Sequence, residues 1–275
     1  DVLPVIGSKE LVAWLPTFLQ SETVLYPKIA YPTYLVGAML AQSHEIAVDI
    51  DASQWPQADL AWVNSPANPT GRVHSEAELR AVIQWSRKNK AVVISDECYL
   101  EFGDGVTPTS IFAYSDGDNA NLLAVHSLSK RSSLAGYRAA FMVGDPALIS
   151  AIREIRKQAG MMVALPVQKA MTAALGDDEH VATARARYNS RRATLKPALV
   201  AAGFRIDESV AGLYIWCTRN EDSWKSVDWL AEIGILATPG SFYGPDGSHH
   251  IRVAMTATDN AINDAAGRIM AAIGA

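Results

Sequence analysis

The sequence has 275 residues, of which 49% are hydrophobic and 19% charged, and its formal net charge is −5. This composition is typical of a globular chain long enough for one large α/β unit or two smaller ones, and it excludes a disordered protein. The acidic balance and the lack of a Lys/Arg cluster argue against a nucleic-acid-binding protein, and no apolar run approaches the ~20 residues of a membrane span.

Two cysteines, Cys98 and Cys217, allow at most one disulfide and lack the spacing of a metal site. We therefore expect a cytoplasmic protein without a metal centre. The chain opens on Asp1 without an initiator methionine and runs at once into an apolar segment. We expect that the N-terminal segment of the fold is missing from this sequence.

The first two-thirds of the chain alternates short apolar runs with helical patterns. A helical period covers residues 75–89, where Ser75 and Glu78 have the spacing of a capping box. Several of the apolar runs are apolar on both faces, as buried parallel strands are. Alternation of this kind predicts a mostly parallel sheet sandwiched by helices. The predicted strands are residues 23–29, 60–64, 91–95, 122–126 and 139–143.

The pattern becomes helical after Pro146. A long helix is predicted over residues 178–202, with Gly203 as its C-terminal stop. We expect a large domain at residues 1–185 and a small C-terminal α+β domain at residues 186–275. The small domain has predicted strands at 212–217 and 250–255 and a closing helix from Asp259.

Polar clusters follow three of the predicted strands. The first spans residues 64–71, the second is the Asp-x-x-Tyr of residues 96–99, and the third is the Ser-x-x-Lys of residues 127–130. Each has an ordinary explanation by itself, since Asn-Pro-Thr-Gly is a good turn and a single lysine is usually solvated. Together they indicate one crevice, because the carboxyl ends of parallel strands share one edge of a sheet.

The order of these motifs resembles class I/II aminotransferases of pyridoxal phosphate (PLP) fold type I. The resemblance covers essentially the whole chain. In detail, residues 122–144, 157–162 and 240–244 resemble the N-succinyldiaminopimelate aminotransferases of actinobacterial lysine biosynthesis. The motifs in chain order are Gly-Ser-Lys at 7–9, Ala-Tyr-Pro at 30–32, Asn-Pro-Thr-Gly at 68–71, Asp-x-x-Tyr at 96–99, Ser-x-x-Lys at 127–130 and then Arg138.

The resemblance implies PLP as the cofactor and gives each motif a role. Lys130 would hold PLP as a Schiff base and later move the proton between the substrate α-carbon and the cofactor. Asp96 would pair with the pyridine nitrogen, which makes the ring a better electron sink. Tyr99 and Asn68 would donate hydrogen bonds to the phenolate oxygen. The resemblance therefore names Lys130, Asp96 and Tyr99 as the catalytic residues.

Further residues would hold the cofactor ring, its phosphate and the substrate. Tyr31 would stack on the ring, with Tyr34 as the alternative. Arg252, in a predicted strand, would bind the substrate carboxylate as a bidentate fork, with Asn68 beside it. The phosphate would be bound by Gly7, Ser8 and Lys9, whose amides open a helix, together with Ser127 and Arg138.

The resemblance also implies amino-acid and 2-oxo-acid substrates and a homodimer with shared active sites. The same motifs serve aminotransferases for aspartate or aromatic amino acids, and fold-type-I carbon–sulfur lyases, because they hold the cofactor without choosing the bond to break. A PLP-binding regulator would need a DNA-binding segment, and none is visible. A plain nucleotide-binding domain would need a glycine-rich phosphate fingerprint, which is absent.

Overall fold

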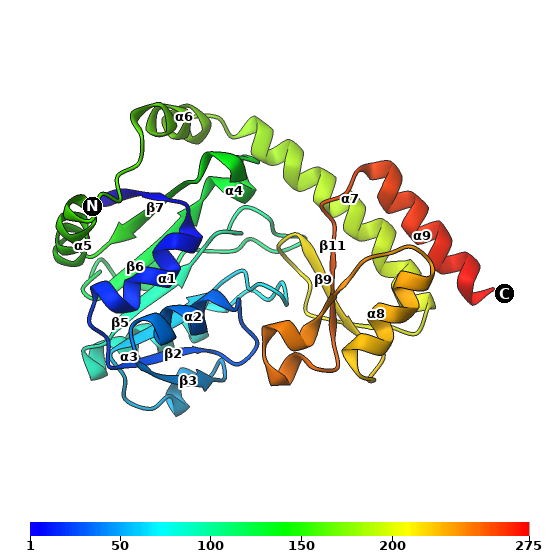
Figure 1. The fold of residues 1–275 in the computed structure, drawn as a ribbon, viewed down its shortest axis with the longest axis horizontal. Coiled ribbons are helices and arrows are strands. Elements are labelled where there is room, and N and C mark those ends of the chain that lie inside the picture. Colours follow the sequence, from blue (N-terminus) through cyan, green and yellow to red (C-terminus); the bar gives the residue numbers. More distant parts are fainter. Residues whose placement is uncertain (275) are drawn as a thin grey trace.

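The computed structural model describes residues 1–274. Its larger sheet has seven strands (Figure 1). Its strand order is β1-β7-β6-β5-β4-β2-β3. Strands β2 to β6 are parallel, whereas β7 is antiparallel to both β6 and β1. The predicted mostly parallel sheet is therefore confirmed. Its strands are β1 Val2–Ile6, β2 Thr23–Pro27, β3 His44–Val48, β4 Leu60–Asn64, β5 Val92–Asp96, β6 Leu122–Ser127 and β7 Ala139–Gly144.

Helices cover both faces of this sheet. Helices α1 (Ser8–Phe18), α2 (Thr33–Leu40) and α5 (Pro146–Gln158) pack on one face, and α3 (Glu76–Asn89) packs on the other. Side chains of a strand alternate between the faces, so Trp62 of β4 contacts the first layer and Val63 the second. Every residue of β4 is buried, which explains its uninterrupted apolar run.

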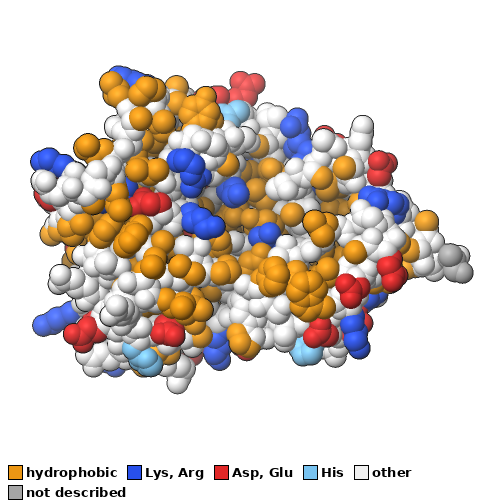
Figure 2. All heavy atoms as spheres, viewed as in Figure 1, with side chains coloured by type: hydrophobic (Ala, Val, Ile, Leu, Met, Phe, Trp, Pro, Cys, Tyr) orange, Lys and Arg blue, Asp and Glu red, His pale blue; other side chains and the backbone are white. Residues whose placement is uncertain are grey.

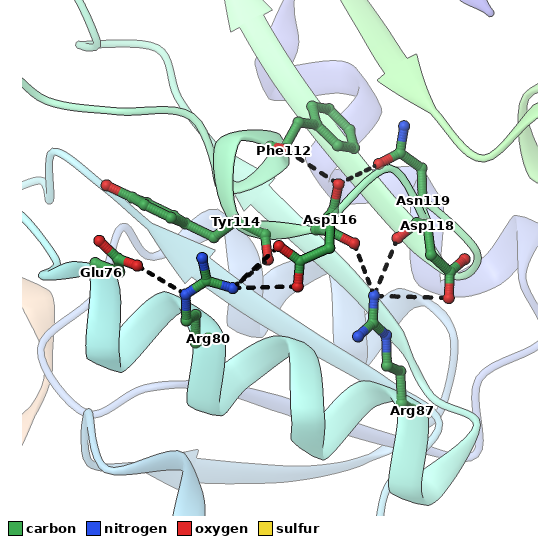
Figure 3. A network of polar contacts seen from close by, with 9 residues as sticks. Glu76, Arg80, Arg87, Phe112, Tyr114, Asp116, Asp118 and Asn119 are labelled. Atoms are coloured by element: carbon green, nitrogen blue, oxygen red, sulfur yellow. Dashed lines mark hydrogen bonds and ion pairs between the residues drawn. The ribbon is translucent and has the colours of Figure 1, made fainter.

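Helix α3 is fixed at both ends by polar contacts that the sequence partly predicted. Ser75 and Glu78 form the expected capping box at its N-terminus. Along its exposed face, Arg80 contacts Glu76 and Asp116, and Arg87 bonds to backbone oxygens of the loop before β6 (Figure 3). These contacts hold the loop that leads into β6, the strand that precedes Lys130.

Two strands of the large sheet escaped prediction. Strand β3 lies at the sheet edge and only Val48 is fully buried, so its sequence lacks the apolar run of an inner strand. Strand β1 pairs with the antiparallel β7 at the opposite edge. Edge strands bury fewer side chains than central ones, and a pattern based on burial therefore detects them poorly.

A four-stranded sheet with the order β10-β11-β9-β8 follows the large one in the chain. The long helix α7 (Glu179–Ala201) leads into it, and α9 (Asp259–Ile273) packs against α7 (Figure 1). The predicted boundary at residue 185 falls within α7 and stays a prediction.

Among the described residues, no helix is both long and apolar enough to cross a membrane. The remaining elements are α4 Leu128–Arg131, α6 Leu165–Leu175, α8 Ser223–Glu232, β8 Arg205–Asp207, β9 Tyr214–Thr218, β10 Thr238–Pro239 and β11 Ile251–Ala254.

Candidate active site

The three polar clusters meet where β4, β5 and β6 end. These strands are neighbours in the sheet, and Asn64 at the end of β4 lies directly opposite Asp96 at the end of β5. The chain leaves β6 at Ser127 and forms the short helix α4, which carries Lys130. Parallel pairing thus brings together residues that are far apart in the sequence.

A cavity of about 350 Å³ opens at this edge. Lys and Arg side chains gather near the centre of the face shown in Figure 2. Of the predicted site residues, all except Gly7 line the cavity, and five others to which the sequence gave no role also line it. The predicted residues are Ser8, Lys9, Tyr31, Asn68, Asp96, Tyr99, Ser127, Lys130, Arg138 and Arg252, and the others are Asn64, Cys98, Ser129, Ala135 and Tyr214.

Lys130 has the environment of a reactive amine. Its pKa is lowered, first because partial burial penalises the charged ammonium and then because Arg252 and Arg138 are also cationic. A lowered pKa leaves a larger fraction of the amine unprotonated at neutral pH. The amine can then attack a carbonyl carbon.

Asp96 is a buried carboxylate without a cationic partner among residues 1–274. It is 6% exposed and accepts hydrogen bonds from the Tyr34 hydroxyl at 2.7 Å and the Cys98 amide at 3.2 Å. Burial raises its pKa, and these hydrogen bonds offset part of the shift. A buried carboxylate of this kind is suited to a ligand that brings its own positive charge.

Asn64 and Arg252 fix the orientation of Asn68. The Asn64 side chain donates to the Asp96 carbonyl and accepts from the Asn68 amide, which ties the loop after β4 to the end of β5. Arg252 of β11 donates to the Asn68 side-chain oxygen at 3.1 Å. Since that oxygen accepts from Arg252, the Asn68 side-chain nitrogen remains to donate elsewhere.

The two candidate stacking tyrosines differ in position. Tyr31 lines the cavity, and the Lys9 ammonium lies 5.8 Å from its ring centroid. Tyr34 is fully buried, stacks on Trp62, and uses its hydroxyl on Asp96. The geometry favours Tyr31 as the ring that faces a ligand, while Tyr34 lies behind it and holds Asp96.

The start of α1 and Arg138 approach each other closely. Gly7 has a φ of +75°, and a Cβ atom there would lie 2.3 Å from an Arg138 side-chain nitrogen. Only glycine accepts both this backbone conformation and this contact. Ser8 and Lys9 follow as the first helical residues, so their amides lack intrahelical partners and suit an anion.

A larger cavity of about 480 Å³ lies beside the first and shares Asn64 with it. Its lining includes Trp55, Trp62 and Trp216, but neither Lys130 nor Asp96. The reactive amine and the buried carboxylate therefore assign the chemistry to the smaller cavity.

Comparison with known proteins agrees with this fold. The family described as aminotransferase class I and II matches residues 1–269, and the chain belongs to this family. A probable aminotransferase of Mycobacterium tuberculosis is 53% identical over 98% of this chain and 66% of its own length. The 4-dedimethylamino-4-oxo-anhydrotetracycline transaminase of Streptomyces rimosus is 49% identical over 98% of this chain and 76% of its own.

Solved structures show the same architecture. A probable N-succinyldiaminopimelate aminotransferase from Thermus thermophilus superposes with a TM-score of 0.91 at 25% identity, covering 99% of this chain and 78% of that one. The chain thus spans about two thirds to three quarters of the length of these relatives.

Class I and II aminotransferases depend on PLP, and the cavity fits this cofactor. The pyridinium nitrogen would supply the cationic partner that Asp96 lacks among the described residues. Lys130 supplies an amine for the aldehyde. At the other end, the α1 amides and Arg138 offer donors for a phosphate, and the glycine at position 7 leaves room for them.

Proposed function

We propose that this protein transfers an amino group between an amino acid and a 2-oxo acid, with PLP as cofactor and glutamate and 2-oxoglutarate as one donor–acceptor pair. The observation that carries the proposal is that the Lys130 amine and the buried Asp96 carboxylate line the same cavity. A reactive amine and a carboxylate without a cationic partner, both lining one cavity, suit the two ends of a pyridine aldehyde.

The catalytic roles follow from these environments. When bound, PLP supplies an electron sink for the pair of electrons left at the substrate α-carbon. Lys130 would hold the cofactor through its amine and would move the α-proton of the substrate. Asp96, oriented by Tyr34, keeps the pyridine nitrogen protonated. Tyr99 and Asn68 would donate to the phenolate oxygen, and Tyr31 would pack on the ring.

The phosphate is held by the backbone amides of Gly7, Ser8 and Lys9, the Ser127 hydroxyl and the Arg138 fork. In the structure the Ser127 hydroxyl accepts from the Ser129 amide, which leaves its proton for an anion. Ser129 lines the cavity next to it and is a further donor.

Gly7→Ala should weaken PLP binding by about 10- to 100-fold, because the methyl group displaces the Arg138 fork and one charged hydrogen bond is lost. A fluorescence or absorbance titration with PLP measures this. Gly105→Ala is the matched control, since its φ is +70° but an added Cβ meets nothing within 4 Å. Equal weakening in both variants would show that backbone strain alone is responsible.

Arg252 binds the substrate α-carboxylate. Its guanidinium carbon lies 4.0 Å from the Tyr214 ring centroid and 5.2 Å from that of Tyr243, and its Nε atom is buried without a partner among the described residues. A carboxylate would satisfy this donor as part of a bidentate pair.

Arg252→Lys should raise KM for donor and acceptor alike by roughly 10- to 100-fold, because lysine keeps the charge and loses the fork. Steady-state kinetics with glutamate and 2-oxoglutarate test this. Arg219→Lys is a control, since Arg219 also stacks on aromatic rings but lies outside the cavity. An unchanged KM in the Arg252 variant would show that Arg252 does not bind the substrate carboxylate.

For the substrate we propose N-succinyldiaminopimelate, in lysine biosynthesis. The support is the resemblance of residues 122–144, 157–162 and 240–244, together with the Thermus structure that bears this name. The Streptomyces relative is named for a tetracycline intermediate, so substrates vary among similar chains. Aspartate and aromatic amino acids are the competing donors, and a carbon–sulfur lyase is the competing reaction.

A donor screen on the full-length protein separates these alternatives. It compares kcat/KM for N-succinyldiaminopimelate with that for unmodified diaminopimelate, aspartate and aromatic amino acids, each with 2-oxoglutarate. A preference for another donor would reject the assignment to lysine biosynthesis but would leave the aminotransferase activity as the proposed function. Product release from a sulfur-containing substrate without a 2-oxo acid would favour a lyase. We also propose that the protein is a homodimer with shared active sites and that it is cytoplasmic. A measurement of its mass in solution tests the homodimer.

A further inference from the structure

Tyr214 joins the small sheet to the cavity. It is the first residue of β9, yet its side chain lines the cavity formed at the edge of the large sheet, and it is only 7% exposed. Its hydroxyl oxygen lies 2.7 Å from that of Tyr99, which follows β5 and is 115 residues away in the sequence. The contact lies in the interior, where a hydrogen bond is stronger than in water.

We infer that Tyr214 is a positioning residue that directs the Tyr99 proton toward the cofactor phenolate and supports the Arg252 guanidinium with its ring. The inference rests on the proposed function and adds to it one residue, Tyr214, which acts through Tyr99 and Arg252. Through this contact, a residue of the small sheet would influence the hydrogen bond that the cofactor phenolate receives.

Proton counting sets the direction of the hydroxyl pair. Each tyrosine hydroxyl has one proton, and either could donate across this contact. If Tyr99 donates to the cofactor phenolate, it cannot also donate to Tyr214. Tyr214 must then donate to Tyr99, which gives a chain from Tyr214 through Tyr99 to the phenolate. Burial raises the pKa of both phenols, so both keep their protons near neutral pH.

The ring of Tyr214 has a second task that is separable from the hydroxyl. Arg252 lies over its face, 4.0 Å from the centroid. A flat aromatic surface restricts the guanidinium plane and is attracted to its charge. Phenylalanine at this position would keep the surface and lose the hydroxyl, whereas leucine would lose both. The two variants therefore separate the two contributions.

The test follows the pH midpoint of the visible absorption change of the PLP-loaded, full-length protein. Tyr99→Phe removes the donor itself and should raise the midpoint, because a phenolate without its donor holds the neighbouring imine proton more tightly. Tyr214→Phe weakens that donor and should raise the midpoint by roughly 0.2 to 0.5 of a pH unit. The double variant should match Tyr99→Phe alone, since the chain is already broken.

Steady-state kinetics test the second contribution, the support that the Tyr214 ring gives to Arg252. Tyr214→Phe should leave KM for glutamate nearly unchanged, whereas Tyr214→Leu should raise it several-fold through Arg252. Tyr243→Phe is the matched control: its ring also lies near Arg252, at 5.2 Å, and its hydroxyl is outside the Tyr99–Tyr214 contact. This control should not move the pH midpoint.

Three results would overturn the inference: an unchanged midpoint in Tyr214→Phe, an additive shift in the double variant, or an equal shift in Tyr243→Phe. Failure of the proposed function has a different signature. In that case the wild-type protein itself would show no PLP-dependent visible band and no response of the band to amino donors.

Discussion

Replacing Lys130 by alanine should remove the visible band of the PLP-bound protein and lower the rate of amino transfer by about 10²–10⁴-fold, the range for loss of a general acid–base group. Lys130 has a lowered pKa and lies at the carboxyl edge of the sheet, in the same cavity as the Asp96 carboxylate. In the proposed function, its loss would remove both the covalent attachment of PLP and the group that moves the proton. Absorbance spectra and single-turnover rates with glutamate measure the two effects.

Two further variants make this result specific. Lys130→Arg keeps a cation in the cavity without an amine that can attack an aldehyde, and it should be as inactive as Lys130→Ala. Lys9 also lines the cavity, and Lys9→Ala should keep the visible band. Borohydride reduction followed by peptide mapping must label Lys130. A label on any other lysine would contradict the assignment.

Asp96→Asn should slow the half-reaction with glutamate by about 10²–10³-fold, the cost of removing one electrostatic group directed at the reacting system. Asparagine nearly preserves the shape of the side chain but not the negative charge that, in the proposed function, would keep the pyridine nitrogen protonated. PLP affinity should fall much less, because Lys130 and the phosphate donors are unchanged. Stopped-flow spectroscopy of the half-reaction and a PLP titration distinguish rate from affinity.

The neighbouring Glu97 provides the control. It is also buried, and burial raises its pKa to about 7, but its carboxylate accepts from Ser110 and the Ile111 amide outside the cavity. Glu97→Gln removes a buried carboxyl one residue away and should leave the half-reaction rate within a few-fold of wild type. Near-normal rates in Asp96→Asn would reject its role.

Tertiary contacts decided which of two tyrosines faces the cavity. The local sequence around Tyr31 and Tyr34 is compatible with either as the stacking residue. Their roles separate because β4 places Trp62 against Tyr34, and β5 places Asp96 within reach of its hydroxyl. Neither contact leaves a local pattern, since the partners of Tyr34 lie 28 and 62 residues further along the chain.

The sequence by itself determined the buried parallel strands, the capping box of α3 and the identity of the motifs at the strand ends. These features depend on local burial patterns and short spacings, which a single chain segment expresses. Only the tertiary structure decided that Asn64 ties Asn68 to β5, that Tyr214 meets Tyr99, and that Arg252 reaches Asn68 across 184 residues. Those contacts join elements that lie far apart in the chain, and their geometry exists only once strand order and register bring the ends of β4, β5, β9 and β11 to one cavity.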